Sequence, residues 1–524
     1  MSMEPASIFN DVLGPVMIGP SSSHTAAPAR IGKVVNMLLQ DEPKKIEITF
    51  EEGGSYAVTY KAQGSDYGFI GGILGMNIID ENIKTALDQA KQREIDVQFV
   101  INRATPNRHP NFARIHVVGE QGASVTVESN SLGGGIFEIT RFEEFPTLIQ
   151  GACYHILAIC DGEEALLKVS GILLNSGTVA DTRTTKGKDQ RILFNVMTEE
   201  RLPEEILNEI QNVEGAKLKE VFPVLPIVKK KNAKVPFMTA EEAEAHFNGK
   251  QLWELACEYE EAISGKSREE ILGMMKEIAN IMRDSAKKAL EGNYEKRGFL
   301  PPQTPVMAQN LKKSKERYLD LGVLNDALLW STAMMEYDIC RGRVVAAPTG
   351  GSCGVIPGAV VCIGDSIGKS EDDIAKALMV AGLIGVFICH QASFGGEVCG
   401  CQAEMGSASA MASAGVVELF GGTPDECFRA AALSFHNMLG LICDPVAGVG
   451  NIPCVSRNAT GASNAVISAN MVMNGFDPYI PLSETIDCMW EVGKMMPKEH
   501  LCTGTGGLCV TKTGLRVLEE LGYY

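Results

Sequence analysis

Apolar and polar positions follow two different periods along the chain. Up to about residue 145 short strand-like runs alternate with helical stretches, and beyond about residue 240 the pattern is helical. The clearest expected strands are residues 45–49, 115–118 and 136–139, and the clearest expected helix is 82–91. Gly133-Gly134-Gly135 predicts a turn that leads into the third of these strands.

A second compact unit follows the first region. Its pattern predicts, in order, strand 155–160, helix 163–175, strands 178–185 and 191–197, helix 203–213 and strand 217–224. The order βαββαβ is the ferredoxin-like arrangement. It resembles the ACT domain, a small regulatory module that binds amino acids at paired interfaces.

The run Lys229-Lys230-Lys231-Asn232-Ala233-Lys234 is charged and poor in apolar residues, which predicts a domain boundary. Beyond it, Ser267 and Glu270 form a capping box ahead of apolar residues spaced on one helical face. Residues 423–426 contain a second capping box of the same kind. The chain is therefore expected to be a multidomain α+β protein. We expect domains at 1–148, 149–228 and 238–524, with a linker at 229–237 and an all-α third domain.

Composition and charge exclude several classes of function. The chain has 524 residues and a net charge of -18, with no concentrated basic stripe, so nucleic-acid binding is not expected. The first twelve residues have no secretory signal. The longest apolar run, 377–389, is too short to cross a bilayer and predicts a buried helix. Fifteen cysteines without an export signal indicate reduced thiols and a cytoplasmic protein with no membrane partner.

A dense polar cluster lies near the N-terminus, in Gly19-Pro20-Ser21-Ser22-Ser23-His24-Thr25. Hydroxyls and backbone N–H groups can hold a carboxylate, and an imidazole can accept a proton near neutral pH. Taken alone, the cluster is more simply an N-cap for the helix expected through residues 30–39. Three consecutive serines nevertheless exceed what a cap needs.

A glycine-rich loop, Thr349-Gly350-Gly351-Ser352, lies within residues 347–357. Such loops present backbone N–H groups to anions. On the loop alone, however, a plain connection between helices is the favoured interpretation. Residues 364–370 imitate a phosphate loop but have three residues between the glycines where four are required, so we reject that motif.

Twelve of the cysteines lie between Cys340 and Cys509, and Cys401, Cys443 and Cys454 each lie close to a Gly or Pro. Three thiolates can hold an iron–sulfur cluster and leave one iron open as a Lewis acid. Their separations of 42 and 11 positions match no ferredoxin pattern, so buried structural cysteines remain the alternative. His436-Asn437 and Arg457-Asn458 flank these cysteines as further candidates, either for contacts to sulfur or substrate or for capping helix ends.

Taken together, these motifs resemble the bacterial iron–sulfur L-serine dehydratases (L-serine ammonia-lyases), in a single-chain form with fused beta and alpha parts. The segments that carry the resemblance are residues 19–25 (GPSSSHT), 109–111 (HPN), 133–135, 347–358, 400–404 (GCQ-x-E), 443–448 (CDPVAG) and 453–459 (PC-x-x-RNA). They cover nearly the whole chain in independent pieces.

The resemblance implies a [4Fe-4S] cluster on Cys401, Cys443 and Cys454, with L-serine converted to pyruvate and ammonia. It also implies an N-terminal domain akin to an allosteric substrate-binding module and an α-helical catalytic domain. His24 is the implied base. Substrate contacts are expected from Ser21, Ser22, Ser23, Thr25, Thr349, Gly350, Gly351, Ser352 and Asn437. A homodimer and a role in amino-acid degradation and gluconeogenesis are expected.

Some relatives end in a cysteine that folds back toward the cluster, whereas this chain ends in Tyr523-Tyr524. Cys399, Cys502 and Cys509 are therefore further thiols of undetermined role. Three alternatives remain: a lyase acting on L-threonine or L-cysteine, a pyridoxal enzyme using one of three lysines, and a non-enzymatic amino-acid sensor. The lysines in question are Lys312, Lys313 and Lys315.

Overall fold

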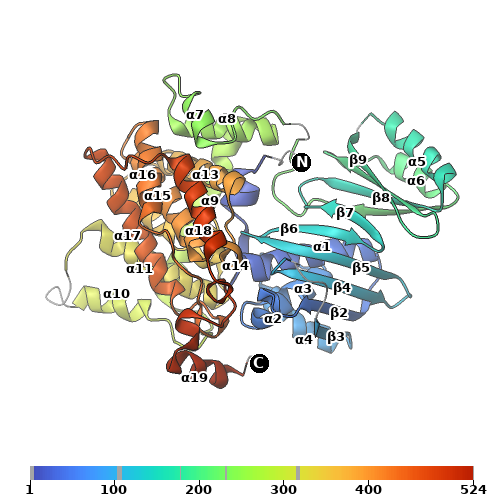
Figure 1. The fold of residues 1–524 in the computed structure, drawn as a ribbon, viewed down its shortest axis with the longest axis horizontal. Helices are drawn as coiled ribbons and strands as arrows, with labels where there is room; N and C mark the ends of the chain where they lie inside the picture. Colours follow the sequence, from blue (N-terminus) through green and yellow to red (C-terminus); the bar gives the residue numbers. More distant parts are fainter. Residues whose placement is uncertain (1–4, 103–108, 178, 231–232, 314–318, 523–524) are drawn as a thin grey trace.

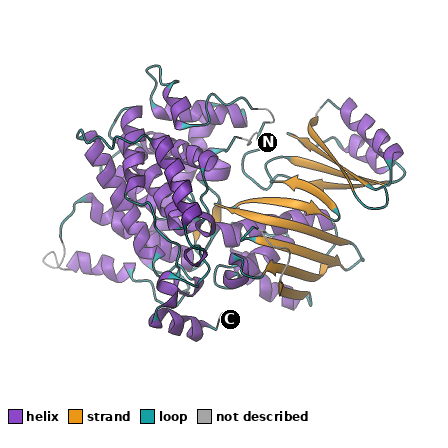
Figure 2. Ribbon diagram, in the orientation of Figure 1, coloured by secondary structure: helices purple, strands orange, loops and turns teal. Residues whose placement is uncertain are grey.

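The structure is a computed structural model that describes residues 5–102, 109–177, 179–230, 233–313 and 319–522. It is a mixed α/β fold in which two sheets lie on one side of the molecule and a large group of helices on the other (Figures 1 and 2). The expected mixed fold class is confirmed at this level.

The first sheet has six strands in the order β3-β2-β4-β5-β6-β7. β3 is parallel to β2, and the other neighbouring pairs are antiparallel. Its strands are β2 (Pro43–Glu51), β3 (Asp96–Asn102), β4 (Phe112–Gly119), β5 (Ser124–Gly133), β6 (Ile136–Phe142) and β7 (Phe145–Ile149). Its helices are α1 (Ala27–Leu39), α2 (Ser55–Thr59), α3 (Ser65–Ile73) and α4 (Ala86–Gln92). Apolar residues of α1 and α3 pack on the buried face of the strands and form one core.

The strands expected at 45–49, 115–118 and 136–139 are confirmed by β2, β4 and β6. The helix expected at 82–91 divides into a tighter turn, η3 (Glu81–Thr85), and α4. Asp80 explains the turn, because its side chain accepts a hydrogen bond from the backbone N–H of Asn82 and begins the helix there.

The second sheet has four antiparallel strands in the order β11-β8-β10-β9. Its elements are β8 (Tyr154–Cys160), α5 (Glu163–Asn175), β9 (Val179–Lys186), β10 (Ile192–Thr198), α6 (Glu204–Gln211) and β11 (Ala216–Val221). The two helices pack on the sheet through a core of their own. The predicted βαββαβ order is confirmed; residue 178, the first of one expected strand, lies outside the described residues.

The helices of the C-terminal part include one, α13, that is buried along most of its length. They are α7 (Ala240–Glu244), α8 (Leu252–Ser264), α9 (Arg268–Glu291), α10 (Thr304–Lys313), α11 (Val323–Ile339), α12 (Ile363–Ser366), α13 (Glu371–Gln391), α14 (Gly396–Cys399), α15 (Ser407–Leu419), α16 (Pro424–His436), α17 (Cys454–Met473), α18 (Leu482–Met495) and α19 (Lys512–Leu521). The capping boxes at Ser267 and Thr423 are confirmed.

The buried helix expected at 377–389 is confirmed within α13. In the described part of the chain, α13 is the one helix long and apolar enough to cross a membrane, and 83% of its apolar window is buried inside the protein. That burial is typical of a core helix.

The expectation of an all-α third part is wrong in one short segment. β12 (Arg343–Val345) pairs antiparallel with β1 (Val16–Ile18), so that Val16 lies opposite Val345 and Ile18 opposite Arg343. Helical periodicity could not reveal this strand, because it is three residues long and its partner lies more than 300 positions away. The pair joins the beginning of the chain to the helical part.

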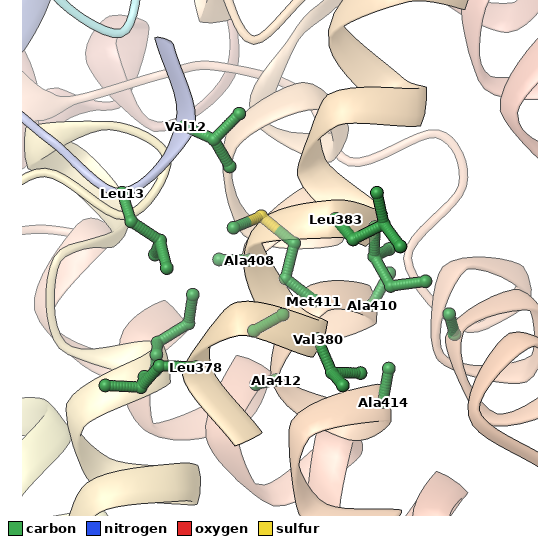
Figure 3. Packing of buried hydrophobic residues seen from close by; sticks show 14 of the residues in the cluster. Val12, Leu13, Leu378, Val380, Leu383, Ala408, Ala410, Met411, Ala412 and Ala414 are labelled. Atoms are coloured by element: carbon green, nitrogen blue, oxygen red, sulfur yellow. The ribbon is translucent and has the colours of Figure 1, made fainter. Parts of the chain in front are cut away.

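Residues 5–13, expected in the first domain, also differ from that expectation. Ile8, Phe9, Val12 and Leu13 are buried in the core of the helical part, and Figure 3 shows Val12 and Leu13 among the side chains of that core. Gly382 and Gly385 of α13 permit the approach. A Cβ on Gly385 would lie 2.1 Å from Cγ1 of Val12, and one on Gly382 would lie 2.4 Å from Cγ2 of Ile8.

The expected linker, 229–237, includes residues 231–232, which lie outside the described residues. On one side of that gap, Lys229 forms an ion pair of 2.8 Å with Asp11. On the other side, Phe237 is buried in the core of the helical part. The segment is therefore packed against the helical part at both ends.

Candidate active site

The β1–β12 pair places the N-terminal serine cluster against the glycine-rich loop. Immediately after β1, the backbone turns through residues 19–21 into η2 (Ser22–Ala26), and after β12 the chain enters the loop containing Gly350. The backbone N–H of Gly350 donates to Oγ of Ser22 over 3.1 Å. A Cβ on Gly350 would lie 3.0 Å from the backbone nitrogen of Ser22, so glycine allows this approach.

His24 is buried within this junction. Its Nδ1 lies 2.8 Å from Oγ of Ser23, and its Nε2 lies 3.0 Å from Oγ of Ser55. The ring also meets Tyr56 edge to face. Burial lowers the pKa of His24 to about 3, so the imidazole is neutral at physiological pH.

The polar cluster opens into a cavity of about 110 Å³ between the first domain and the helical part. Ser21, Ser23, His24 and Gly351 line it together with two carboxyl groups and three cysteines. These further residues are Glu397, Glu404, Cys443, Cys454 and Cys502. Lys61, Arg297 and Arg341 also line the cavity, and their positive charges favour an anionic substrate.

Two of the three predicted cysteines, Cys443 and Cys454, line this cavity, and Cys401 lies close to both. Cys454 begins α17, Cys401 directly precedes the helical turn η6 (Gln402–Gly406), and Cys443 forms a β-bridge with Leu501. Burial, and secondarily the charge of Glu404, raises the pKa of the Cys401 thiol to about 12. For Cys443 the hydrogen bond with Cys502 is the largest cause of a raised pKa, followed by burial.

Arg457 is the cation among these sulfurs. Its guanidinium donates to the thiol of Cys401 and to the carbonyl of Ile442 over 2.9 Å, and it forms an ion pair of 3.0 Å with Asp444. Asn458, the next residue, accepts from the backbone N–H of Gly354 over 2.9 Å and donates to the carbonyl of Gly351 over 2.8 Å. Asn458 thereby fixes the glycine-rich loop to α17.

The two carboxyl groups are held by residues from other motifs. Thr349 donates to Oε1 of Glu404 over 2.9 Å, and Asn111 donates to Glu397. Burial raises the pKa of Glu404 to about 7, and the pKa of Glu397 is also raised by burial. The HPN segment thus holds Glu397, a residue of the cavity wall, through Asn111.

The glycine turn at 133–135 lies against the same junction. All three glycines have positive φ, between 60° and 96°, a conformation that other residues rarely adopt. A Cβ on Gly133 would lie 3.0 Å from the backbone nitrogen of Gly395, just before α14. The turn therefore needs glycine both for its backbone and for its close contact with the helical part.

The other predicted substrate contacts do not line the cavity. Ser22 and Ser352 are buried in the loop contacts, and Thr25 donates to the carbonyl of Gln63 over 2.6 Å. The structure does not bring Asn437 to the cavity: its amide donates to Asn464 over 2.7 Å on an exposed surface. His436 lies against Thr485 and likewise does not line the cavity.

Of the further thiols, Cys502 alone lines the cavity. Cys399 packs against Gly493 of α18, and the Cys509 thiol donates to the carbonyl of Pro445 over 3.2 Å. Lys312 and Lys313 are exposed on α10 and do not line the cavity; Lys315 lies outside the described residues.

Sequence reasoning did not single out Ser55, Glu397, Glu404 or the three cationic residues of the cavity. Glu404 had a detectable signal, since it closes the Gly-Cys-Gln-x-Glu segment. The other residues stand in no distinctive local pattern, and only the folded chain brings them together.

The sulfur donors fit an iron–sulfur cluster. In the described part of the chain, no three His, Cys, Asp or Glu side chains are close enough to chelate a single ion. Cys443 and Cys454 instead line the cavity and Cys401 lies close to both, and burial and mutual repulsion oppose the ionisation of these thiols. The positive iron ions of a cluster, for which thiolates are suitable soft ligands, would offset that repulsion and favour the ionised thiols, as Arg457 does only in part.

Comparison with known proteins gives an independent result. Residues 247–509 match the family model described as serine dehydratase alpha chain. The chain is 38% identical over 258 residues to the probable L-serine dehydratase, alpha chain, of Bacillus subtilis, covering 49% of this chain and 85% of that protein. It is 35% identical to the L-serine dehydratase, alpha chain, of Peptoniphilus asaccharolyticus, over 52% of this chain and 93% of that protein.

A third relative extends the similarity to the N-terminal half. L-serine dehydratase 1 of Escherichia coli is 26% identical over 509 residues, which cover 94% of this chain and 97% of that protein. The region matched by the family model contains every cysteine of the cavity, and the longer alignment spans residues on both sides of it. The chain belongs to the serine dehydratase alpha chain family.

Proposed function

We propose that this chain is a lyase that converts L-serine to pyruvate and ammonia. The observation that carries the proposal is the cavity in which His24 and its serines, from the start of the chain, meet the cysteines of the helical part. The relative that covers 49% of the chain and the relative that covers 94% of it are both named as L-serine dehydratases, which agrees with this activity.

We propose further that Cys401, Cys443 and Cys454 hold a [4Fe-4S] cluster. When bound, such a cluster supplies an open iron that acts as a Lewis acid on the substrate hydroxyl. Arg457 would stabilise the thiolates, since it already donates to Cys401. Cys502 lies beside Cys443 and is the nearest further thiol to the proposed ligands.

The residues of the chain account for the remaining chemistry. The neutral imidazole of His24 can accept the α-proton at a ring nitrogen, and the hydroxyls of Ser23 and Ser55 orient the ring. Ser21, Ser23 and the backbone at Gly351 would hold the substrate carboxylate, with Lys61 and Arg341 attracting it. Loss of water gives aminoacrylate, which tautomerises and hydrolyses to pyruvate and ammonia.

The parts of the chain outside the helical part suit a regulated enzyme in which all domains belong to one chain. We propose that residues 149–228 are an ACT-like unit, that residues 1–148 are akin to an allosteric substrate-binding module, and that two copies pair. All fifteen cysteines lie in the described part and all are free thiols, which supports a reducing, cytoplasmic setting.

The experiment is anaerobic purification with iron and sulfide analysis, followed by assay of pyruvate release from L-serine. We expect roughly four irons and four sulfides per chain. Replacement of each proposed ligand by serine should remove cluster and turnover, whereas Cys488→Ser, on the exposed face of α18, should remove neither. His24→Gln should keep the iron and lose turnover, and the control His116→Gln, on the first sheet, should keep both.

Other outcomes would redirect the proposal. Turnover without iron, with a lysine adduct trapped by borohydride, would indicate pyridoxal chemistry. Faster turnover of L-threonine or L-cysteine than of L-serine would change the substrate. Tight serine binding without any turnover would indicate a sensor.

A further inference from the structure

A larger second cavity, of about 680 Å³, lies where the three parts of the chain meet. One wall is α1, a second is the side of α9 carrying Met274, Ile278 and Ile281, and a third is the segment 222–226 that follows β11. Residues 13–16, which lead into β1, and the loop 76–79 complete the lining. This cavity is separate from the candidate active site, because the two share no lining residue.

The walls are mainly apolar. Beside the three residues of α9, the apolar lining includes Phe9, Leu13, Met37, Met76, Ile78, Ile79, Phe222, Val224 and Leu225. Ile79 is 50% exposed and Phe222 38% exposed, so large apolar side chains reach solvent at the rim. A volume of this size suits a small organic ligand, and such sites combine apolar walls with a few polar groups.

Two of the five polar residues that line the cavity, Arg30 and Lys33, are cationic; the others are Asn36, Asn77 and Glu277. Arg30 of α1 is 2% exposed, and its Nε has no hydrogen-bond partner among the described residues. Its Nη1 is occupied, since it donates to the carbonyl of Gly135 over 2.6 Å. Lys33, one helical turn along, lines the same cavity and donates to the carbonyl of Gly75.

Arg30 and Lys33 place two positive charges at one wall of the cavity, and an anionic group bound there would be attracted to both. Asp11 also lies close enough to stabilise the charge of Arg30, but its carboxylate is already paired with Lys229. Glu277, also in the lining, adds a negative charge that disfavours multiply charged anions. One carboxylate on an apolar body therefore matches the site better than a phosphate.

We propose that this cavity binds a small monocarboxylate with an apolar body, with its carboxylate at Arg30 and Lys33 and its body against α9. The ligand would contact all three parts of the chain at once. It would therefore favour the docked arrangement that forms the cavity, by the mass-action rule that ligands stabilise the state they bind.

Binding should also affect the candidate active site. Leu13, Gly14, Pro15 and Val16 line the cavity, and Val16 begins β1, which aligns the serine cluster with the glycine-rich loop. Stabilising this segment should raise turnover at low substrate. This second consequence rests on the proposed serine dehydratase activity, whereas binding itself does not.

The test of binding is calorimetric titration of the full-length protein with octanoate, with octanamide and acetate as matched compounds. We expect octanoate to bind at least about tenfold more tightly than either, since it alone has both charge and body. Lys33→Met should weaken octanoate binding by about tenfold, and Lys287→Met, an exposed lysine of α9 outside the cavity, should not. Ile278→Trp should block binding by filling the apolar end.

Circular dichroism would establish that each variant is folded, and the comparison of octanoate with octanamide requires no variant. No octanoate binding, equal binding of octanamide, or full binding by Ile278→Trp would overturn the site. Octanoate should lower the KM for L-serine in the wild type and not in Ile278→Trp. If bound octanoate did not change serine turnover, only the proposed coupling to the active site would be refuted. If the protein bound octanoate but had no activity on serine, the proposed function would be refuted and the proposed binding site would stand.

Discussion

The contact between Val12 and Gly385 of α13 can be tested by making the first side chain smaller and the second larger. Gly385 lies on α13 where a Cβ would fall 2.1 Å from Cγ1 of Val12 and 3.1 Å from the side chain of Met411. Val12 and Met411 are fully buried, so neither can move into open space. The single substitutions are Gly385→Ala and Val12→Ala, and the critical variant combines them.

The expected free energies follow from this geometry. Overpacking by one methyl costs about 1–3 kcal/mol, and alanine in a helix interior returns about 0.5–1 kcal/mol relative to glycine. Gly385→Ala should therefore destabilise by about 1–2 kcal/mol. Val12→Ala should cost about 2 kcal/mol, from two lost carbons and the space they leave. In the double variant the new methyl fills part of that space, so the total should fall short of the sum by about 1 kcal/mol.

The assay is unfolding in urea followed by helical circular dichroism, with pyruvate release measured on the same samples. Gly273→Ala on α9 is the matched control: its Cβ would meet nothing within 4 Å, so it should stabilise slightly. Gly385→Ala should also lower turnover, because Val12 lies shortly before β1 and His24. Strictly additive effects of Gly385→Ala and Val12→Ala would refute the packing of this segment against α13.

Two further predictions concern the junction and its pH dependence. Ser22→Ala leaves the buried N–H of Gly350 without its acceptor, which should cost about 1–3 kcal/mol and reduce turnover; an unchanged KM and kcat would contradict the role of this bond. Glu260 accepts hydrogen bonds from Ser7 and Ile8, and burial raises its pKa to about 7 from an ordinary value of 4.5. Between these two values the folded state keeps a proton that the unfolded state loses. The stability that this group contributes below pH 4.5 is therefore lost as the pH rises to 7, by roughly 3 kcal/mol. The urea midpoint of unfolding should fall less over this pH range in Glu260→Gln than in the wild type, and an equal fall in both would refute the raised pKa.

Much of the fold could be predicted because many of its elements have recognisable patterns in the local sequence. The βαββαβ unit, the capping boxes at Ser267 and Thr423 and the apolar core of α13 are each visible in a short window of sequence. β12 and the burial of residues 8–13 could not be predicted in this way. Both depend on partners in the opposite half of the chain, and local periodicity contains no information about which distant segment will cover an apolar face.

The candidate site likewise contains residues that local sequence reveals and residues that only the tertiary structure reveals. The cysteines and the serine cluster lie close to Gly and Pro and could be found as motifs, and the structure brings Cys443 and Cys454 close to Cys401. The position of Asn437, shortly before Cys443, predicts a substrate contact, but α16 ends just before it and its side chain is exposed. Ser55, which contacts His24, and Glu397, which lines the cavity, come from elements with no distinctive sequence, so only tertiary structure identifies them.

The position of His24 explains why the two halves must act together. The family match at 247–509 includes all the thiols of the cavity but neither His24 nor its serines. Those residues are held by the β1–β12 pair, by the bond from Gly350 to Ser22, and by the anchoring of residues 8–13 in the core around α13. Separating the halves would expose that apolar segment to water and withdraw the proposed base from the proposed cluster ligands. Stability and catalysis in this chain therefore depend on the same contacts, and any ligand that strengthens the junction should act on both.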